Sequence, residues 1–109
     1  MYKRQEYIKK INLNFQSIKY DANKTFIASD ALIGCSIIAK PNSSIWFSTV
    51  LYSPDNKGTV YLGKGSNIQD NSIFNTKGKD IYIGDKVTIG HNVIINGAIK
   101  VYDLSLIHI

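Results

Sequence analysis

The strongest constraint on this chain is a six-residue hydrophobic period in the stretch IGDKVTIGHNVIINGAI, residues 83–99. Ile83, Ile89 and Ile95 occupy one phase of the repeat, and a small or polar residue follows each of them. A period of six matches neither the 3.6-residue period of an α-helix nor the two-residue alternation of a long strand. It is typical of a β-helix, in which each hexapeptide forms a short strand and a corner. We expect the isoleucines, and the residues four positions after them, to point inward.

The same period runs through most of the chain. Two segments interrupt it, residues 52–61 and 76–79, and the Pro and Gly residues of the first mark an outward loop. In left-handed β-helices with this repeat, three hexapeptides make one triangular coil. The sequence therefore predicts an all-β fold, a left-handed parallel β-helix of about four triangular coils, with a β-sandwich of short strands as the alternative. The earlier inward positions are Ile27, Ile33, Ala39, Ile45, Leu51, Leu62, Ile68 and Phe74.

Both ends of the chain depart from the period. Residues 1–20 are basic, and Ile8, Ile11, Phe15 and Ile18 have the spacing of one helical face. We expect a short N-terminal helix or irregular cap there; a loose lead-in and a mitochondrial presequence are alternatives. The β-helix domain is predicted over residues 21–101 and an atypical tail over 102–109. Cys35, the single cysteine, is expected as a bystander thiol in an outward or corner position.

The charge distribution argues against a nucleic-acid partner. The net charge is +5, but residues 1–10 hold four of the basic residues, and the rest of the chain is nearly balanced. A nucleic-acid interface would cluster basic residues on one face together with stacking aromatic side chains. No apolar run approaches the roughly 18 residues of a membrane helix, and the start lacks the apolar core of a secretory signal. We therefore expect no nucleic acid, no membrane insertion, and a mitochondrial or cytoplasmic rather than a secreted protein.

Four stretches carry a resemblance to a known family. They are TFIASDALIG (25–34), SSIWFSTVL (43–51), NIQDNS (67–72) and the repeat at 83–99. Together they closely resemble gamma-class carbonic anhydrases and their relatives, over about residues 18–100. The resemblance implies a left-handed β-helical trimer, with active sites between subunits and a C-terminal helix along the prism. The sequence ends before the last coils and that helix, so the resemblance also implies a C-terminal truncation.

The resemblance also implies where a metal would bind. In the family three histidines hold a catalytic zinc or iron, and the corresponding residues here are Asn75, His91 and Asn96. A catalytic zinc site uses three imidazole, thiolate or carboxylate ligands and keeps a position open for water, and a neutral amide oxygen is a weaker donor. We therefore expect His91 as a metal-binding residue with degenerate partners. No cofactor is expected unless a partner chain completes a zinc or iron site.

Other polar positions agree better with the family pattern. Asn67 and Gln69 stand where the family places side chains beside the metal-bound solvent, so the resemblance implies a catalytic role for them. Asp70 and Asp55 are expected at a subunit contact, and Tyr52 replaces an arginine that helps to bind subunits together. Asn and Asp also satisfy corner amides in β-helices, so a purely structural role remains an alternative.

Three functional hypotheses follow from these residues. The first is a gamma carbonic anhydrase-like protein without catalytic metal, a structural or assembly subunit of a homo- or hetero-trimer, as on mitochondrial respiratory complex I. The second is a zinc-dependent carbonate dehydratase, active only when a partner chain supplies the missing histidines. The third is a hexapeptide-repeat acyltransferase in which His91 serves as the general base.

Overall fold

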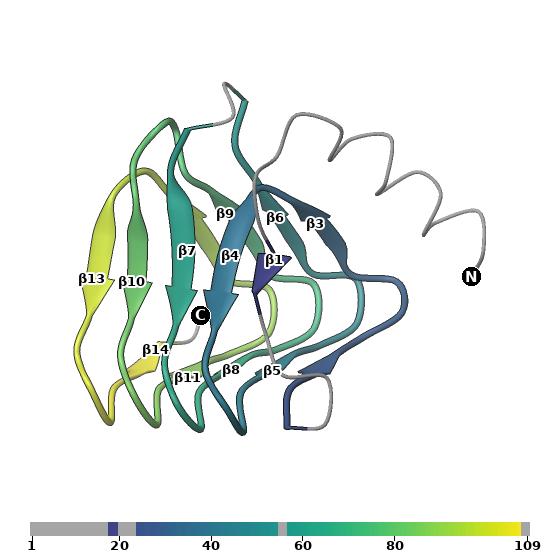
Figure 1. Cartoon of the computed structure of the whole chain (residues 1–109), viewed down its shortest axis with the longest axis vertical. Coiled ribbons are helices and arrows are strands. Elements are labelled where there is room, and N and C mark those ends of the chain that lie inside the picture. Colours follow the sequence, from purple (N-terminus) through teal and green to yellow (C-terminus); the bar gives the residue numbers. More distant parts are fainter. Residues whose placement is uncertain (1–17, 20–23, 55–56, 108–109) are drawn as a thin grey trace.

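The computed structural model describes residues 18–19, 24–54 and 57–107, and these residues form a parallel β-helix (Figure 1). Their strands lie in three sheets, and successive strands of each sheet are three elements apart in the chain. The strands are β1 (Ile18–Lys19), β2 (Phe26–Ile27), β3 (Leu32–Gly34), β4 (Ser36–Ala39), β5 (Ser44–Ile45), β6 (Val50–Tyr52), β7 (Thr59–Leu62), β8 (Asn67–Ile68), β9 (Ile73–Asn75), β10 (Ile81–Ile83), β11 (Thr88–Ile89), β12 (Ile94–Asn96), β13 (Ile99–Val101) and β14 (Leu106–Ile107).

Each coil contributes one strand to each of three faces. Face A contains β1, β4, β7, β10 and β13; face B contains β2, β5, β8, β11 and β14; face C contains β3, β6, β9 and β12. The predicted all-β parallel helix of about four coils is confirmed, and the described residues include no α-helix. Accordingly, no helix in this described part is long and apolar enough to cross a membrane.

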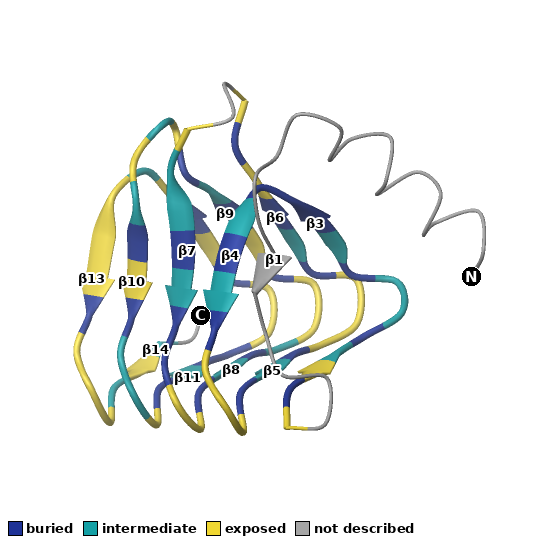
Figure 2. Cartoon of the chain, in the orientation of Figure 1, coloured by how far each residue is buried: buried dark blue, intermediate teal, exposed yellow. Residues whose placement is uncertain are grey.

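The strand register stacks the predicted inward side chains into columns that fill the interior. Most members of these columns are buried, and Figure 2 shows buried segments recurring in β4, β7 and β10. Branched and aromatic side chains suit such columns because each packs on its neighbour in the next coil. The columns are Ile27, Ile45, Ile68, Ile89 and Ile107 in face B; Ile33, Leu51, Phe74 and Ile95 in face C; and Ala39, Leu62, Ile83 and Val101 in face A.

The second set of inward positions is held partly by hydrogen bonds. Ser72 Oγ donates to the Gly90 carbonyl oxygen at 2.8 Å and accepts from the Val93 backbone N–H at 3.2 Å. Ser66 makes the same two bonds with Gly84 and Val87. A buried hydroxyl is tolerated when both its donor and its acceptor are satisfied. These serines therefore link consecutive coils along the axis.

One inward prediction meets an open end of the helix, and one outward prediction is wrong. Ile99 stands in register with the buried Ile81, as an inward residue should, but it is 39% exposed because β13 is the outermost described strand of face A and pairs with β10 alone. Cys35 was expected outward or at a corner, but its side chain is fully buried. Strand alternation continues from Ile33 through Gly34, so Cys35 also points inward. Burial raises the pKa of the Cys35 thiol to about 12.

The ends of the described residues add two observations. Most of the predicted N-terminal helix or cap, residues 1–20, lies outside the described residues, but Ile18–Lys19 form β1 and pair with β4. At the other end β14 pairs with β11, and Ile107 stands in register with Ile89. The coil path therefore continues past Val101 into the segment predicted as a tail.

From β2 onward, all length variation between coils lies at one corner. Equivalent face B residues, Ile27, Ile45, Ile68, Ile89 and Ile107, lie 18, 23, 21 and 18 positions apart. The extra residues fall between β6 and β7 and between β9 and β10, where the chain passes from face C to face A. From β2 onward, the other two corners keep the same two-residue turns in successive coils. The passage from β1 to β2 is one residue longer, since Ile18 and Ile27 are nine positions apart and their register partners Ile37 and Ile45 are eight apart.

Candidate functional site

The candidate metal ligands lie on the two edges of face C. At the edge that we call the regular edge, the chain enters face C from face B through two-residue turns at 47–48, 70–71 and 91–92. At the opposite edge, which we call the loop edge, the chain leaves face C for face A and carries the two insertions. His91 lies at the regular edge, whereas Asn96 ends β12 at the loop edge.

The backbone of the regular edge repeats from coil to coil. Ser48, Asn71 and Asn92 have φ angles of 58°, 63° and 61°, in the left-handed region. Asn visits this region more readily than most residues, because its short polar side chain can bond locally. The repeated turn places the preceding residues, Asp70 and His91, at equivalent points of successive coils.

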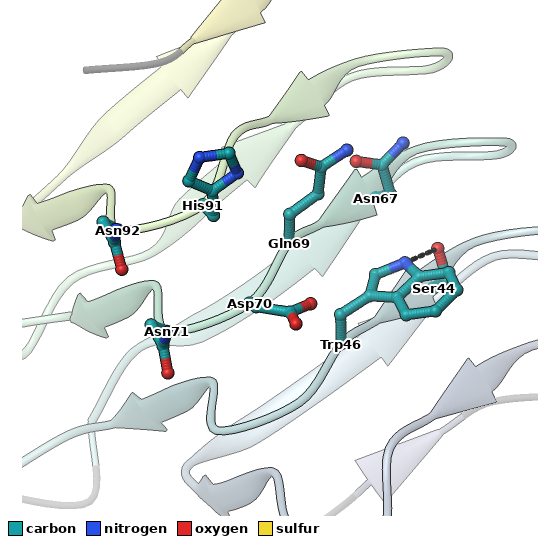
Figure 3. Close-up of a pocket in the computed structure, with 8 residues that line it drawn as sticks. All are labelled: Ser44, Trp46, Asn67, Gln69, Asp70, Asn71, His91 and Asn92. Carbon is teal, nitrogen blue, oxygen red and sulfur yellow. Dashed lines mark hydrogen bonds between the residues drawn. The ribbon is translucent and has the colours of Figure 1, made fainter.

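A polar pocket of about 490 Å³ lies along this edge, and Figure 3 shows its lining residues on neighbouring coils. Four predicted site residues line it together: Asn67, Gln69, Asp70 and His91. One wall is Trp46, whose Nε1 donates to Ser44 Oγ at 2.9 Å. Asn67 Oδ1 is buried and has no hydrogen-bond partner in the described residues. The pocket therefore offers hydrogen-bonding groups of both kinds beside a single imidazole.

The loop edge is organised by side chains instead. Tyr52, Asn75 and Asn96 are paired in register across β6, β9 and β12. Asn75 Nδ2 donates to the Tyr52 hydroxyl oxygen at 3.0 Å, and Asn75 Oδ1 accepts from the Lys77 backbone N–H at 3.0 Å. Both ends of the Asn75 amide are thus engaged by its own chain.

The buried side of the same edge is also hydrogen-bonded. Thr76 Oγ1 donates to the Lys57 carbonyl oxygen at 3.0 Å and accepts from the Gly78 backbone N–H at 3.3 Å. One loop is therefore tied to the other. Asp80 Oδ1 accepts from the Thr59 backbone N–H at 2.9 Å, which fixes the start of β7.

These residues do not fit a metal site within one chain. Across the described residues, no group of three His, Cys, Asp or Glu side chains could hold a metal ion. His91 and Asn96 are five positions apart in mostly extended chain, which is up to roughly 16 Å at about 3.3 Å per residue. Asn75 is also a poor donor, since its oxygen already accepts a backbone hydrogen bond. A catalytic zinc ion needs three convergent, stronger ligands.

The structure thus sorts the predicted site residues into two groups. Asn67, Gln69, Asp70 and His91 meet at the regular edge, whereas Asn75 and Asn96 lie at the loop edge. Asp55 lies outside the described residues. Sequence reasoning missed the hydroxyl of Tyr52 as the partner of Asn75. The available signal was that both residues end a face C hexapeptide, one coil apart.

The sequence also did not predict that three exposed aromatic side chains would pack together beside the pocket. The ring centroids of Phe26 and Trp46 are 4.9 Å apart, and those of Trp46 and Phe47 are 6.3 Å apart. All three side chains remain about 40% exposed. The three residues sit on the first two coils, next to the polar part of face B, so the pocket has an apolar border on one side.

Comparisons with known proteins support the family. Gamma carbonic anhydrase 1, mitochondrial, from Arabidopsis thaliana is 40% identical over 81 residues, which are 68% of this chain and 29% of that protein. Carbonic anhydrase from Geobacillus kaustophilus (strain HTA426) is 40% identical over 79 residues, 72% of this chain and 42% of that protein. Uncharacterized transferase YtoA from Bacillus subtilis (strain 168) is 34% identical over 87 residues, 78% of this chain and 50% of that protein.

No family model matches the chain, and no solved structure matches it. The period and the three parallel sheets define a hexapeptide-repeat β-helix protein. Within that class, the matched stretch shows that the chain belongs to the gamma carbonic anhydrase-like family. The aligned part covers half or less of the length of each of these relatives.

Proposed function

We propose that this chain is a gamma carbonic anhydrase-like assembly subunit of a trimer and holds no catalytic metal. The observation that carries the proposal is the state of Asn75. Its amide donates to the Tyr52 hydroxyl and accepts from the Lys77 backbone, so it acts as a structural group of the loop edge. An amide in this role stabilises a loop without an ion.

The chemistry of hydration supports the same reading. A metal-bound water has a pKa near 7 and supplies hydroxide at neutral pH, whereas free water does not. Among the polar groups that line the pocket at the regular edge, His91 is the one imidazole. An imidazole without a metal can act as a general base, but this typically contributes only 10²–10⁴-fold. We therefore expect no carbon dioxide hydration comparable to that of a metal-loaded enzyme.

The test uses the purified full chain. Its mass in solution is measured by sedimentation, its zinc and iron content by mass spectrometry after anaerobic incubation with each metal, and its carbon dioxide hydration by stopped flow. We expect an assembled species without stoichiometric metal and with no hydration above buffer. Stoichiometric metal together with hydration by the homo-oligomer would refute the proposal.

The partner proposal extends to mixed assemblies. Relatives from Arabidopsis thaliana are named as mitochondrial gamma carbonic anhydrases, and they match 66–68% of this chain. We propose a related β-helix chain as the trimer partner, in a mitochondrial assembly such as the respiratory complex. Co-expression with such a relative and purification on a tag carried by this chain tests it. Recovery of the tagged chain alone contradicts the mixed assembly.

A transferase is the second candidate, because YtoA is named a transferase and aligns with 78% of this chain. In this reading His91 is the general base in the pocket at the regular edge. Calorimetric titration with acetyl-coenzyme A distinguishes this candidate from the first. Absence of heat at millimolar ligand removes the transferase reading and leaves the assembly subunit.

A further inference from the structure

The pocket at the regular edge lies beside an incomplete column of outward side chains. By the register of β5, β8 and β11, Trp46, Gln69 and Gly90 take the same outward position in successive coils. Glycine has no side chain, so the column leaves room beside Gln69. The volume of about 490 Å³ is in the range of sites that hold small molecules.

The pocket has the opposite charge to the chain as a whole. The net charge of the chain is +5. Among the described residues that line the pocket there is no lysine or arginine, and with histidine neutral Asp70 is the one formally charged side chain. Figure 3 shows the Asp70 carboxylate pointing toward Trp46. An anion and an indole ring therefore border the same space.

The Asp70 carboxylate is not used by the fold. It makes no hydrogen bond or ion pair within the described part of the chain. Each of the other described aspartates accepts a backbone N–H from a neighbouring coil, Asp30 from Ser48, Asp80 from Thr59, Asp85 from Lys64 and Asp103 from Asp85, at 2.8–2.9 Å. Asn67 Oδ1, in the wall of the pocket, also lacks a donor within the described residues. Two unmet acceptors thus lie at the pocket, and a ligand with several N–H donors suits them.

The aromatic wall is held in place by its neighbours. The ring centroids of Phe26, Trp46 and Phe47 are 4.9–6.3 Å apart, so the three rings pack on one another and leave no space for a cation among them. Only Trp46 of these three lines the pocket. A wall that is already ordered loses little side-chain freedom when a ligand packs against it.

We infer that this pocket binds a small organic cation, a primary alkylammonium whose N–H groups donate to the Asp70 carboxylate and to Asn67 Oδ1 while its carbon chain packs on Trp46. Because the Asn67 oxygen is buried, its amide turns toward the pocket to accept this bond. A cation is attracted by the face of an indole ring, and hydrogen bonds between ionised groups are stronger than neutral ones. This amine site goes beyond the proposed assembly function.

A series of ligands with one carbon chain and different head groups tests the inference on the unmodified full chain. Trp46 is the single tryptophan, so its fluorescence reports binding at the wall of the pocket. We expect a saturable change with n-butylammonium, about tenfold or more weaker binding of n-butanol, and none of butanoate. Equal responses to the cation and the alcohol would overturn the inference.

The role of the N–H groups has its own probe. Tetramethylammonium carries the charge without any donor, and it should bind several-fold more weakly than n-butylammonium. Tighter binding of tetramethylammonium would overturn the assignment of hydrogen bonds to Asp70 and Asn67.

Substitutions locate the site by calorimetric titration with n-butylammonium. Asp70→Asn keeps the shape of the side chain but removes its charge, and it should weaken binding about tenfold or more. Asp103→Asn is the matched control: it makes the same change of net charge at an exposed corner between faces A and B, and its amide oxygen can still accept from Asp85. Unchanged affinity in Asp70→Asn would overturn the inference. If Asp70→Asn does not fold, the ligand series on the unmodified chain decides.

The indole is tested in the same way. Trp46→Leu should weaken binding several-fold, and Trp46→Phe should have an intermediate affinity, because a phenyl ring attracts a cation less than an indole does. Equal affinities of Trp46→Leu and the unmodified chain would show that the ligand does not lie on this wall, contrary to the inference.

Sedimentation distinguishes a free amine from a lysine side chain of a neighbouring chain, which has the same head group. With saturating n-butylammonium we expect the mass of the assembly to stay unchanged. A fall in mass would show that a neighbouring chain occupies the pocket, and it would overturn the inference. Failure of the proposed function gives a different result, which is stoichiometric metal together with hydration in the unmodified chain.

Discussion

At both edges of face C the chain turns from one face to the next, but different interactions hold the two turns. At the regular edge, a turn with a left-handed residue at Ser48, Asn71 or Asn92 returns in three consecutive coils. At the loop edge, the Tyr52 hydroxyl instead accepts from Asn75 at the end of β9, and Thr76 donates to Lys57 in the loop before β7. The length of the connection there varies between coils. The backbone thus determines one edge, and side chains determine the other.

The difference teaches that one residue type can have two unrelated roles a few residues apart. Asn71 is placed by its φ of 63°, and Asn75 by the hydrogen bonds of its amide. Reading Asn75 only as a lost metal ligand overlooks what the amide does in this chain. The following predictions test whether the stability of the regular edge depends on backbone conformation and that of the loop edge on side-chain interactions.

The largest expected effect concerns Cys35, which occupies the loop edge of the first coil, where no insertion is present. Burial raises the pKa of its thiol from 9.0 to about 12, so the folded chain holds the thiol proton more tightly than the unfolded chain. This contribution is complete below about pH 9 and is lost as the pH rises toward 12. The loss is about 1.4 kcal/mol per pH unit in that range.

Urea unfolding between pH 8 and pH 11 measures the effect in the unmodified chain and in Cys35→Ala. The alanine variant is less stable at pH 8 because it leaves a small cavity. Its free energy of unfolding should fall less with pH than that of the unmodified chain, so the two curves converge. Parallel curves would show that the thiol is not buried in the protonated form.

The next effect concerns the hydroxyl of Thr76. Thr76→Val keeps the shape of the side chain but removes its hydrogen bonds to the Lys57 carbonyl oxygen, which also accepts from Ser53 Oγ, and to the Gly78 N–H. The loss of these two bonds should cost about 1–3 kcal/mol. Thr88→Val on the outer side of face B is the matched control and should change stability by less than about 0.5 kcal/mol. Chemical denaturation compares the two variants. Similar losses for both would mean that the loop edge does not depend on these bonds.

The smallest effects separate the two asparagines. Asn71→Ala should lose about 1 kcal/mol because a left-handed φ is costly for alanine, and Asn71→Gly should recover most of that loss. Asn75→Ala should lose a similar amount through its two hydrogen bonds, and Asn75→Gly should recover none of it. Melting temperatures of the four variants test the contrast. If glycine restored the melting temperature at both positions, backbone conformation would determine both edges, contrary to the prediction.

The six-residue period predicts the interior well for a physical reason. Parallel pairing fixes the register of every coil on its neighbour, so Ile68 must stand between Ile45 and Ile89 once the faces are formed. The same register makes the joint position of Asp70 and His91 readable from the sequence. Each follows an inward isoleucine by two residues at the same corner.

The six-residue period does not predict the loop edge, where side-chain hydrogen bonds rather than a repeated backbone turn hold the chain. The bond between Tyr52 and Asn75 spans a coil with five extra residues, and no repeat specifies how those residues fold. Ile99 stands in the inward column as the period predicts, but it is exposed because β13 is the outermost described strand of face A. Cys35 was misplaced because alternation continues through Gly34 into the corner.

From β2 onward the extra residues are confined to a single corner, which has a practical consequence. Coils with five and three additional residues there keep the same columns as the shorter coils on either side. Foreign peptides grafted both between β6 and β7 and between β9 and β10 should therefore be displayed along one ridge of the prism at the spacing of the strands, about 4.8 Å per coil. The β-helix is therefore a scaffold that can present short epitopes or reporter tags at a regular spacing.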